Sequence, residues 1–246
     1  METMSTEAFA RAGDFVRGHA RPLEQAIFAH EFEDGPVAAI WEALAVFQNA
    51  DGGFGHGLES DLWLPDSSVL ATTVGLQVLR AYGATSGHPL VKGAMAYLVA
   101  TYDADRGVWP IIPPNVDDAA HAPWWAYSED IADAWQGFLA NPRAEIGGYL
   151  HQYRDLVPDS LREEVTDALL QHLRGDGSVV EMHDLLCYVR FAETPGLPEE
   201  LKEDLTGHLA PILSRAVVTD PEKWGQYGLQ PLDVVDRPAS PFAGLF

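Results

Sequence analysis

The sequence predicts an all-α protein, and three observations lead to that class. Apolar residues recur at helical spacing along most of the 246 residues, beginning with Phe9, Ala12 and Val16. β-Branched residues are scattered, and no hairpin turn separates two alternating apolar runs. Caps, prolines and glycine-containing turns divide the chain into about ten helical segments. We therefore expect paired helices and no sheet.

The first half of the chain carries a start or stop for each expected helix. Ser5 or Thr6 caps the first helix, Pro22 stands in the first turn of the second, and residues 34–36 (DGP) separate the second from the third. Residues 83–87 form a linker before the fifth helix. The expected helices of this half span residues 5–19, 22–32, 36–48, 69–82 and 88–102.

The second half opens with the longest irregular segment, residues 103–127, which holds four prolines and three tryptophans. Its aromatic content argues against disorder, so we expect it to pack over another surface. The tail, residues 219–246, is rich in proline and glycine, and we expect it to be extended within a single domain of residues 1–246. The remaining expected helices span residues 128–140, 142–156, 158–174, 178–193 and 198–217.

Composition excludes several classes of partner. Fifteen Lys and Arg against 37 Asp and Glu give a net charge of −22, which argues against nucleic acid and anionic membrane surfaces. No apolar run approaches the roughly 18 to 20 residues that span a bilayer, and the N-terminus lacks a signal-peptide pattern, so we expect a cytoplasmic protein. The acidic, lysine-poor surface fits either a salt-rich cytoplasm or a GC-rich genome. Oligomeric state is not predicted.

The chain is organised around residues 47–83, FQNADGGFGHGLESDLWLPDSSVLATTVGLQVLRAYG. One helix ends at Gln48, a glycine-rich turn follows, and the next helix begins at Val69, which makes a helical hairpin with an elaborate corner. The paired glycines allow positive φ, and Asn49 and Asp51 can bond their own backbone. A purely structural corner therefore explains much of this pattern.

Part of the stretch matches a known repeat. Gln48-x-x-Asp51-Gly52-Gly53-Phe54-Gly55, then Pro65 and Ala71-Thr72-Thr73, resembles the repeat of the prenyltransferase and squalene-cyclase superfamily over about 26 residues. Similar turns stand at Asp105 and Asp176, 54 (105 − 51) and 71 (176 − 105) residues further on. The resemblance implies an α/α toroid, here of about five helical hairpins. The final hairpin is expected to be missing, which leaves the ring shortened or incompletely closed at the C-terminus.

The resemblance also implies where a ligand would bind. In that superfamily the inner helices begin at the mouth of a central cavity, which places Asp66, Ser67 and Ser68 on the rim and Thr72 one turn deeper. The same three rim residues can cap the helix that follows them. No Arg or Lys accompanies them, and this departure argues against a diphosphate-dependent prenyltransferase.

Different residues are candidates for metal binding and for acid catalysis. His183, Asp184 and Cys187 have the residue types of the superfamily's zinc site, but a buried structural cysteine beside a capping histidine explains them better, so we expect no metal and no cofactor. The D-x-D-D acid motif of class II terpene cyclases is absent. Its nearest substitutes are the paired acids at 117–118 and 233–236, which can share a proton if they are desolvated together.

Aromatic and polar side chains of two loops complete the candidate site. The segment from His121 to Tyr127 can wall an apolar pocket, although loop packing explains it equally well. The loop after the glycine turn offers further acid or base groups. The candidate catalytic residues are Asp61, Asp66, Asp117, Asp118, His121 and His183, and the candidate substrate-binding residues are His56, Glu59, Ser67, Ser68, Thr72, Trp109, Trp124, Trp125 and Tyr127.

Three functions follow as hypotheses. The resemblance implies a protein that binds an apolar, isoprenoid-like small molecule in a central cavity and cyclises or isomerises it by acid–base chemistry. A carbohydrate-active α/α toroid, a hydrolase or lyase with paired carboxylates, is the first alternative. A catalytically silent relative that binds a ligand or partner is the second. The first hypothesis requires the long loop, the corner loop and His183 to converge on one cavity of several hundred Å3, about the usual size of a small-molecule site.

Overall fold

The computed structural model describes residues 3–128, 140–175 and 181–246, and it confirms the all-α class. These residues contain ten α-helices, four short 3-10 turns and isolated β-bridges, with no β-strand among them. Within the same ranges, no helix is both long enough and apolar enough to cross a bilayer. The expected helix 128–140 lies almost wholly outside the described residues.

The observed helices follow the expected order. The 3-10 turns cover Val116–Asp118, Pro123–Trp125, Arg154–Leu156 and Pro221–Lys223. The α-helices are α1 (Thr6–His19), α2 (Pro22–Phe32), α3 (Val37–Ala45), α4 (Val69–Ala81), α5 (Pro89–Thr101), α7 (Arg143–Gln152), α8 (Asp159–Arg174), α9 (Met182–Ala192), α10 (Glu199–Ala216) and α11 (Pro231–Val234).

Local chemistry fixes several of these starts. Ser5 Oγ accepts the N–H of Ala8 at 3.1 Å, and Pro22 and Pro89 stand in the first turns of α2 and α5, where a missing N–H costs nothing. The expected helix 142–156 is shorter than predicted. It ends at Gln152 and continues only as a 3-10 turn.

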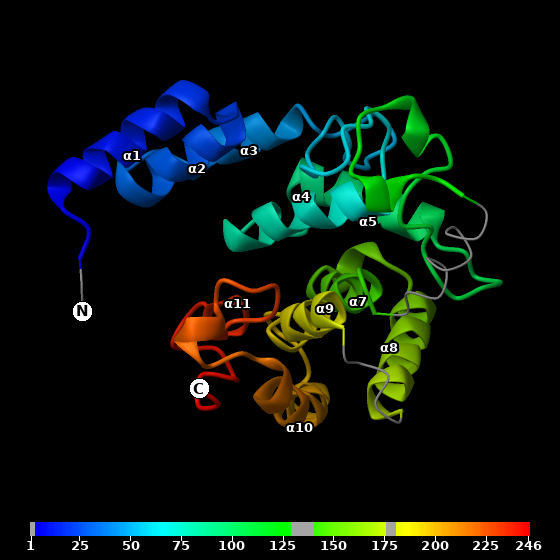
Figure 1. The fold of residues 1–246 in the computed structure, drawn as a ribbon. Helices are drawn as coiled ribbons and strands as arrows, with labels where there is room; N and C mark the ends of the chain where they lie inside the picture. The colour runs from blue at the N-terminus through cyan, green and yellow to red at the C-terminus, as the bar shows by residue number, and fades with distance from the viewer. Residues whose placement is uncertain (1–2, 129–139, 176–180) are drawn as a thin grey trace.

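Three helical hairpins build most of the structure: α4 with α5, α7 with α8, and α9 with α10. Because α4 packs on α7 and α7 packs on α9, these three helices form an inner row. The chain follows an arc from α1–α3 through this row to α10 and α11 (Figure 1). The middle helix, α7, is buried at every position from Arg143 to Leu150.

A pair of glycines lets the inner helices approach α7 closely. A Cβ on Gly148 would lie 2.5 Å from Oγ1 of Thr194 and 3.1 Å from the Arg80 guanidinium. A Cβ on Gly147 would lie 2.7 Å from Leu169 of α8. The backbone of α7 is therefore the surface on which α4, α8 and α9 meet.

The glycine turn is the structural corner that the sequence predicts. Gly52 has φ +89°, and the N–H of Gly53 bonds Asp51 Oδ1 at 3.0 Å. The amide of Gln48 donates to the carbonyls of Gly52 and Leu90, both at 2.9 Å, which ties the turn to α5. The corner is thus held by its own polar side chains.

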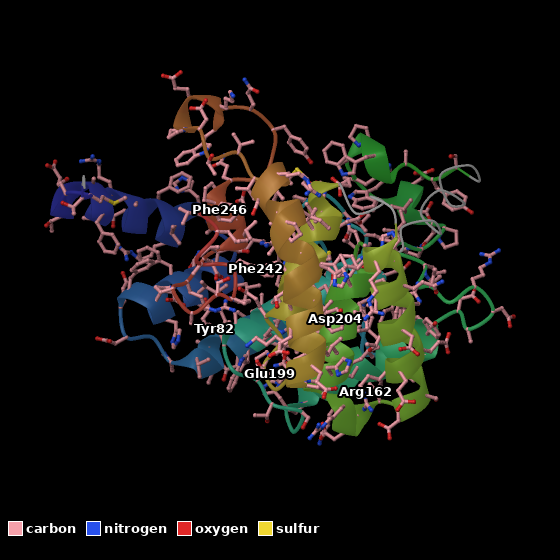
Figure 2. All side chains as sticks on the ribbon, turned by 90° about the horizontal axis from the view of Figure 1, so that it is seen from below. Tyr82, Arg162, Glu199, Asp204, Phe242 and Phe246 are labelled. Carbon is pink, nitrogen blue, oxygen red and sulfur yellow. The ribbon has the colours of Figure 1, made fainter. Side chains whose placement is uncertain are left out.

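The tail is not extended, and this prediction was wrong. Pro231–Val234 form one helical turn, α11, and its N-cap residue Gln230 and Asp233 cap each other. Leu229, Val234 and Phe242 are buried in the main core, so the tail packs on α9 rather than trailing away. It lies beside α10 in both views (Figures 1 and 2). Prolines set the ends of short elements here, while sparse apolar residues supply the packing.

Candidate binding cavity on the inner helices

A cavity of about 430 Å3 opens beside the inner row, near the C-terminal ends of α4 and α9. Its wall combines α4, α7, α9, the turn after α9 and the tail. Three arginines from three of these segments face it. The lining residues are Gln77, Arg80, Ala81, Tyr149, Arg190, Glu193, Pro195, Asp236 and Arg237.

Arg80 lies in the last turn of α4 and is held by neutral acceptors. Its Nε donates to Gln152 at 2.7 Å, and its terminal nitrogens donate to the Arg190 carbonyl at 3.0 Å and to Thr194 Oγ1 at 3.3 Å. Its guanidinium stacks 4.3 Å from the centre of the Tyr149 ring. Across the described residues, Arg80 has no carboxylate within ion-pair distance. Its position is therefore fixed by uncharged groups, and no ion pair within the described ranges offsets its charge.

Glu145 of α7 forms a polar network behind the cavity. Its side chain is 1% exposed, and its carboxylate accepts hydrogen bonds from Arg190 at 3.0 Å, from Gln77 at 3.2 Å and from the Tyr149 hydroxyl. The thiol of Cys187 lies 3.9 Å from the same carboxylate. A buried carboxylate needs several donors, because they replace the water shell that it loses on burial.

This network sets the protonation of its neighbours. Burial and the adjacent Glu145 carboxylate raise the pKa of the Tyr149 hydroxyl well above its ordinary value, so Tyr149 stays a hydrogen-bond donor. The same two causes raise the pKa of the Cys187 thiol, which is therefore unreactive. Burial is the largest single influence on the pKa of Arg190 and lowers it, but Glu145, Cys187 and Tyr149 together raise the pKa above its ordinary value.

The rim of the cavity carries a second set of charges. Arg237 of the tail bonds Glu193 at 2.7 Å and Asp236 at 3.1 Å. The guanidinium side chains of Arg190 and Arg237 stay 40% and 47% exposed, so both keep donors available to a ligand. The carboxylates of Glu193 and Asp236 line the same rim, and Arg237 pairs with both of them.

The predicted rim residues hold the corner rather than the cavity. Asp66, Ser67 and Ser68 were all candidate caps, and of these Ser68 caps α4, through its buried hydroxyl. Ser67 donates to Asp51 at 2.8 Å, and Asp66 accepts from Asn115 at 2.6 Å. Their side chains are used in joining the turn to the loops around it.

The other candidates of the corner loop also bond locally. His56 pairs with the Asn49 side chain at 2.8 Å, and the buried Thr72 hydroxyl accepts the Phe54 N–H at 3.0 Å. The Glu59 carboxylate accepts a backbone N–H two residues on, at 3.3 Å. Each of these contacts stabilises the corner, and none of these side chains lines the cavity.

The long loop packs over the corner loop, as its aromatic content predicts. The N–H of Ala122 donates to the Asp61 carbonyl at 2.8 Å. Trp109 is buried, and its indole N–H donates to a backbone carbonyl of α5. Asp117 lies 3.4 Å from His121 and accepts the N–H of Tyr127. Trp125 packs on a second core cluster of Leu62, Leu64, Ile111, Ile112 and Val116, while Asp118, Trp124 and Tyr127 are exposed.

His183 lies at the start of α9 and contacts the tail. It pairs with Glu181 at 2.7 Å and lies 3.3 Å from the Tyr227 hydroxyl. Glu181, rather than His183, caps α9, so the capping role predicted for this histidine is wrong. Cys187 is buried, as expected, and no three His, Cys, Asp or Glu of the described residues stand close enough to hold a metal.

The structure thus joins two of the three regions that were expected to converge. The corner loop and the long loop meet, whereas the contacts of His183 are with Glu181 and the tail. None of the candidate residues lines the cavity beside α4 or a shallower one of about 400 Å3 on α8. The last two turns of α8 and the Gly175 that follows them line that second hollow.

Sequence reasoning missed the residues that do line the cavity. Arg80 and Arg190 each interrupt an apolar helical run, in VLRA and YVRFA, and Glu145 does the same in RAEIGGYL. A charge inside an otherwise buried helix is a signal for a polar network, because an unpaired buried charge is costly. That signal could have been found in the sequence, but the partners could not.

Comparisons with known proteins yield no match to a family model, a curated protein or a solved structure. A functional argument therefore depends on the charges, burial and bonds of the cavity itself.

Asp184, near the start of α9, is expected to make the stability of the protein depend on pH. Burial and the nearby Glu181 raise its pKa to about 6, while a hydrogen bond from the Asn141 backbone opposes them. A raised folded-state pKa means that Asp184 favours folding below the ordinary value of 3.8 and loses that contribution as the pH rises through about 6.

Asp184→Asn is therefore expected to raise the free energy of unfolding at pH 7 by about 1 kcal/mol, allowing for partial exposure. The gain should shrink as the pH falls from 6 towards 4. Urea unfolding at several pH values measures it. A gain that stays constant with pH, or a loss of stability at pH 7, would contradict the assignment.

Proposed function

We propose that this protein binds a small organic anion, a carboxylate or phosphate, in the cavity that Arg80, Arg190 and Arg237 line. One observation carries the proposal. Arg80 is fixed at the cavity wall by neutral acceptors and pairs with no carboxylate of the described residues, although the chain has 37 acids. In such an acidic chain, a guanidinium without a carboxylate partner is the group that an external anion would bind with the most favourable free energy.

The geometry supports this ligand class in two further ways. Arg80 bonds the backbone carbonyl of Arg190, and both residues line the same cavity, where two guanidinium charges would favour an anion. Arg237 reaches the same cavity from the tail and keeps exposed donors. The volume of about 430 Å3 falls within the usual range for small-molecule sites, roughly 300 to 1,000 Å3.

The proposal keeps part of the hypothesis drawn from the resemblance. The inner row of α4, α7 and α9 would be the inner wall of an α/α ring, and the cavity would lie on that wall. An isoprenoid ligand stays a prediction, in which a diphosphate head group would contact the arginines. A sugar acid would present a carboxylate to the same groups, so the experiment includes both head groups.

Binding is best measured by calorimetry at low ionic strength, with pyrophosphate and glucuronate as separate probes. We expect at least one to bind with a dissociation constant below about 1 mM, since charge-assisted hydrogen bonds to several arginines contribute a few kcal/mol. Arg80→Gln and Arg190→Gln should each raise that constant about tenfold or more. The preferred probe separates the phosphate class from the sugar-acid class.

Arg106→Gln is the matched control, because Arg106 lies in the long loop and is paired with Asp103 at 3.8 Å, away from the cavity. It should leave the affinity unchanged. Equal losses in Arg106→Gln and Arg80→Gln, or no binding of either anion, would refute the proposal. Binding of neutral farnesol without either anion would favour the apolar ligand instead.

A further inference from the structure

The inner wall of the cavity carries an excess of positive charge. Arg190 pairs with Glu145 behind it at 3.0 Å, whereas Arg80 pairs with no carboxylate of the described residues. Two arginines against one carboxylate leave one positive charge in excess at this wall. An acidic group of a ligand is therefore favoured here.

The rim of the cavity carries the opposite excess. Arg237 of the tail pairs with Glu193 at 2.7 Å and with Asp236 at 3.1 Å, so two carboxylates stand against one arginine. One negative charge is left in excess at the rim, where it favours a positively charged group and disfavours a second anionic one. The cavity as a whole is bipolar.

Glu193 also has an unused acceptor. Its side chain is 11% exposed, and one carboxylate oxygen accepts a hydrogen bond from Arg237. The other oxygen is buried and has no hydrogen-bond partner among the described residues. Such an oxygen is costly, because it has lost water and gained no donor. A ligand N–H beside Glu193 would supply the missing bond, since the last torsion of a glutamate is soft and lets the carboxylate turn toward a donor.

The backbone around the cavity favours a cation as well. The cavity lies at the C-terminal ends of α4 and α9, where the helix dipoles are negative and the last carbonyls lack helical partners. Glu193 directly follows α9, and its neighbour Thr194 bonds Arg80 at 3.3 Å. The two charge groups therefore stand close enough for one small molecule to contact both.

We propose that the anion bound in this cavity also carries an ammonium group, a few bonds from its carboxylate or phosphate, as in an amino acid or an aminoalkyl phosphate. The acidic end contacts Arg80 and Arg190, and the ammonium end contacts the carboxylates of Glu193 and Asp236. This ligand class rests on the proposed function, because it adds a second contact to the same anion. A plain anion of equal size satisfies the inner wall alone.

Calorimetry with two matched pairs of probes tests the ammonium contact. The pairs are phosphoethanolamine with ethyl phosphate, and aspartate with succinate, and in each pair only the first compound has an amino group. In at least one pair, the amino compound should bind about tenfold or more tightly than its partner, since a hydrogen bond between charged groups changes an affinity by that factor. The tighter pair separates a phosphate ligand from a carboxylate ligand.

Glu193→Gln should reduce this tenfold advantage to about threefold or less, because it removes the charge that pairs with the ammonium group. Asp236→Asn should reduce the advantage in the same direction, and its side chain is 66% exposed, so this variant should fold. Glu164→Gln is the matched control. It removes one carboxylate charge from the surface of α8, outside the cavity, and should leave the advantage unchanged.

Equal or reversed affinities within both pairs would overturn the ammonium contact and leave the anion site in place. Failure of all four probes, and of pyrophosphate and glucuronate, would refute the anion site and the ammonium contact with it. An equal loss of the advantage in Glu164→Gln and Glu193→Gln would assign it to net charge and would also overturn the role of the rim.

Discussion

Gly52→Val is expected to lower the free energy of unfolding by at least about 3 kcal/mol, because two costs add at this position. Gly52 has φ +89°, where a β-branched residue is strained. A Cβ there would also lie 2.3 Å from the carbonyl oxygen of Gly93, a backbone atom of α5 that cannot move alone. The clash would separate the corner from α5 and break the Gln48 bonds that join them.

Gly83→Val separates the two costs. Gly83 has φ +73°, but nothing lies within 4 Å of a Cβ at this position, so the substitution adds backbone strain without a clash. We expect a loss of about 1 to 2 kcal/mol for Gly83→Val. Urea unfolding of both variants measures the difference. Equal losses would mean that the corner yields to a side chain, and the role of Gly52 in holding α5 would be wrong.

Glu145→Ala is expected to cost about 3 kcal/mol of stability, because it removes the acceptor of three donors at once. Arg190 would lose its carboxylate partner, and the fully buried Tyr149 hydroxyl would lose its main acceptor. The partial exposure of Arg190 keeps the cost below that of a wholly buried charge. The measurement is again urea unfolding at neutral pH.

Glu164→Ala is a matched control for this variant. Glu164 also accepts a tyrosine hydroxyl, that of Tyr102 at 2.7 Å, but it does so at the surface. Water replaces that bond on mutation, and we expect a loss of less than about 1 kcal/mol. If both variants lost the same stability, the network around Glu145 would be no more than a set of solvated contacts.

Much of the fold follows from local chemistry. The N-cap at Ser5, the prolines that open α2 and α5, and the Asp51 turn each act over a few residues, so their effects are written in consecutive positions of the sequence. The tail shows the limit of this reasoning. Its single helical turn and its buried Phe242 depend on contacts with elements far away in the chain, and its prolines and glycines alone indicate only irregular structure.

The residues that line the cavity could not be predicted from local sequence either. Arg80 bonds the Arg190 carbonyl across 110 positions of sequence, and Arg237 enters from a tail that was expected to be extended. From helical periodicity alone, a charged residue is predicted to face solvent. Its partner inside the protein is set by which helices pack together, and the sequence does not show that. The corner residues were noticed for their motif, and they proved to hold the turn.

Anomalous diffraction from crystals soaked in selenate tests most directly whether Arg80 and its neighbours hold an anion. Selenate is a small dianion that can be located by the scattering of its selenium. The proposal predicts a peak in the cavity within hydrogen-bond distance of Arg80 and Arg190, and its loss in Arg80→Gln. An empty cavity beside occupied surface sites, or a peak that persists without the Arg80 side chain, would contradict it.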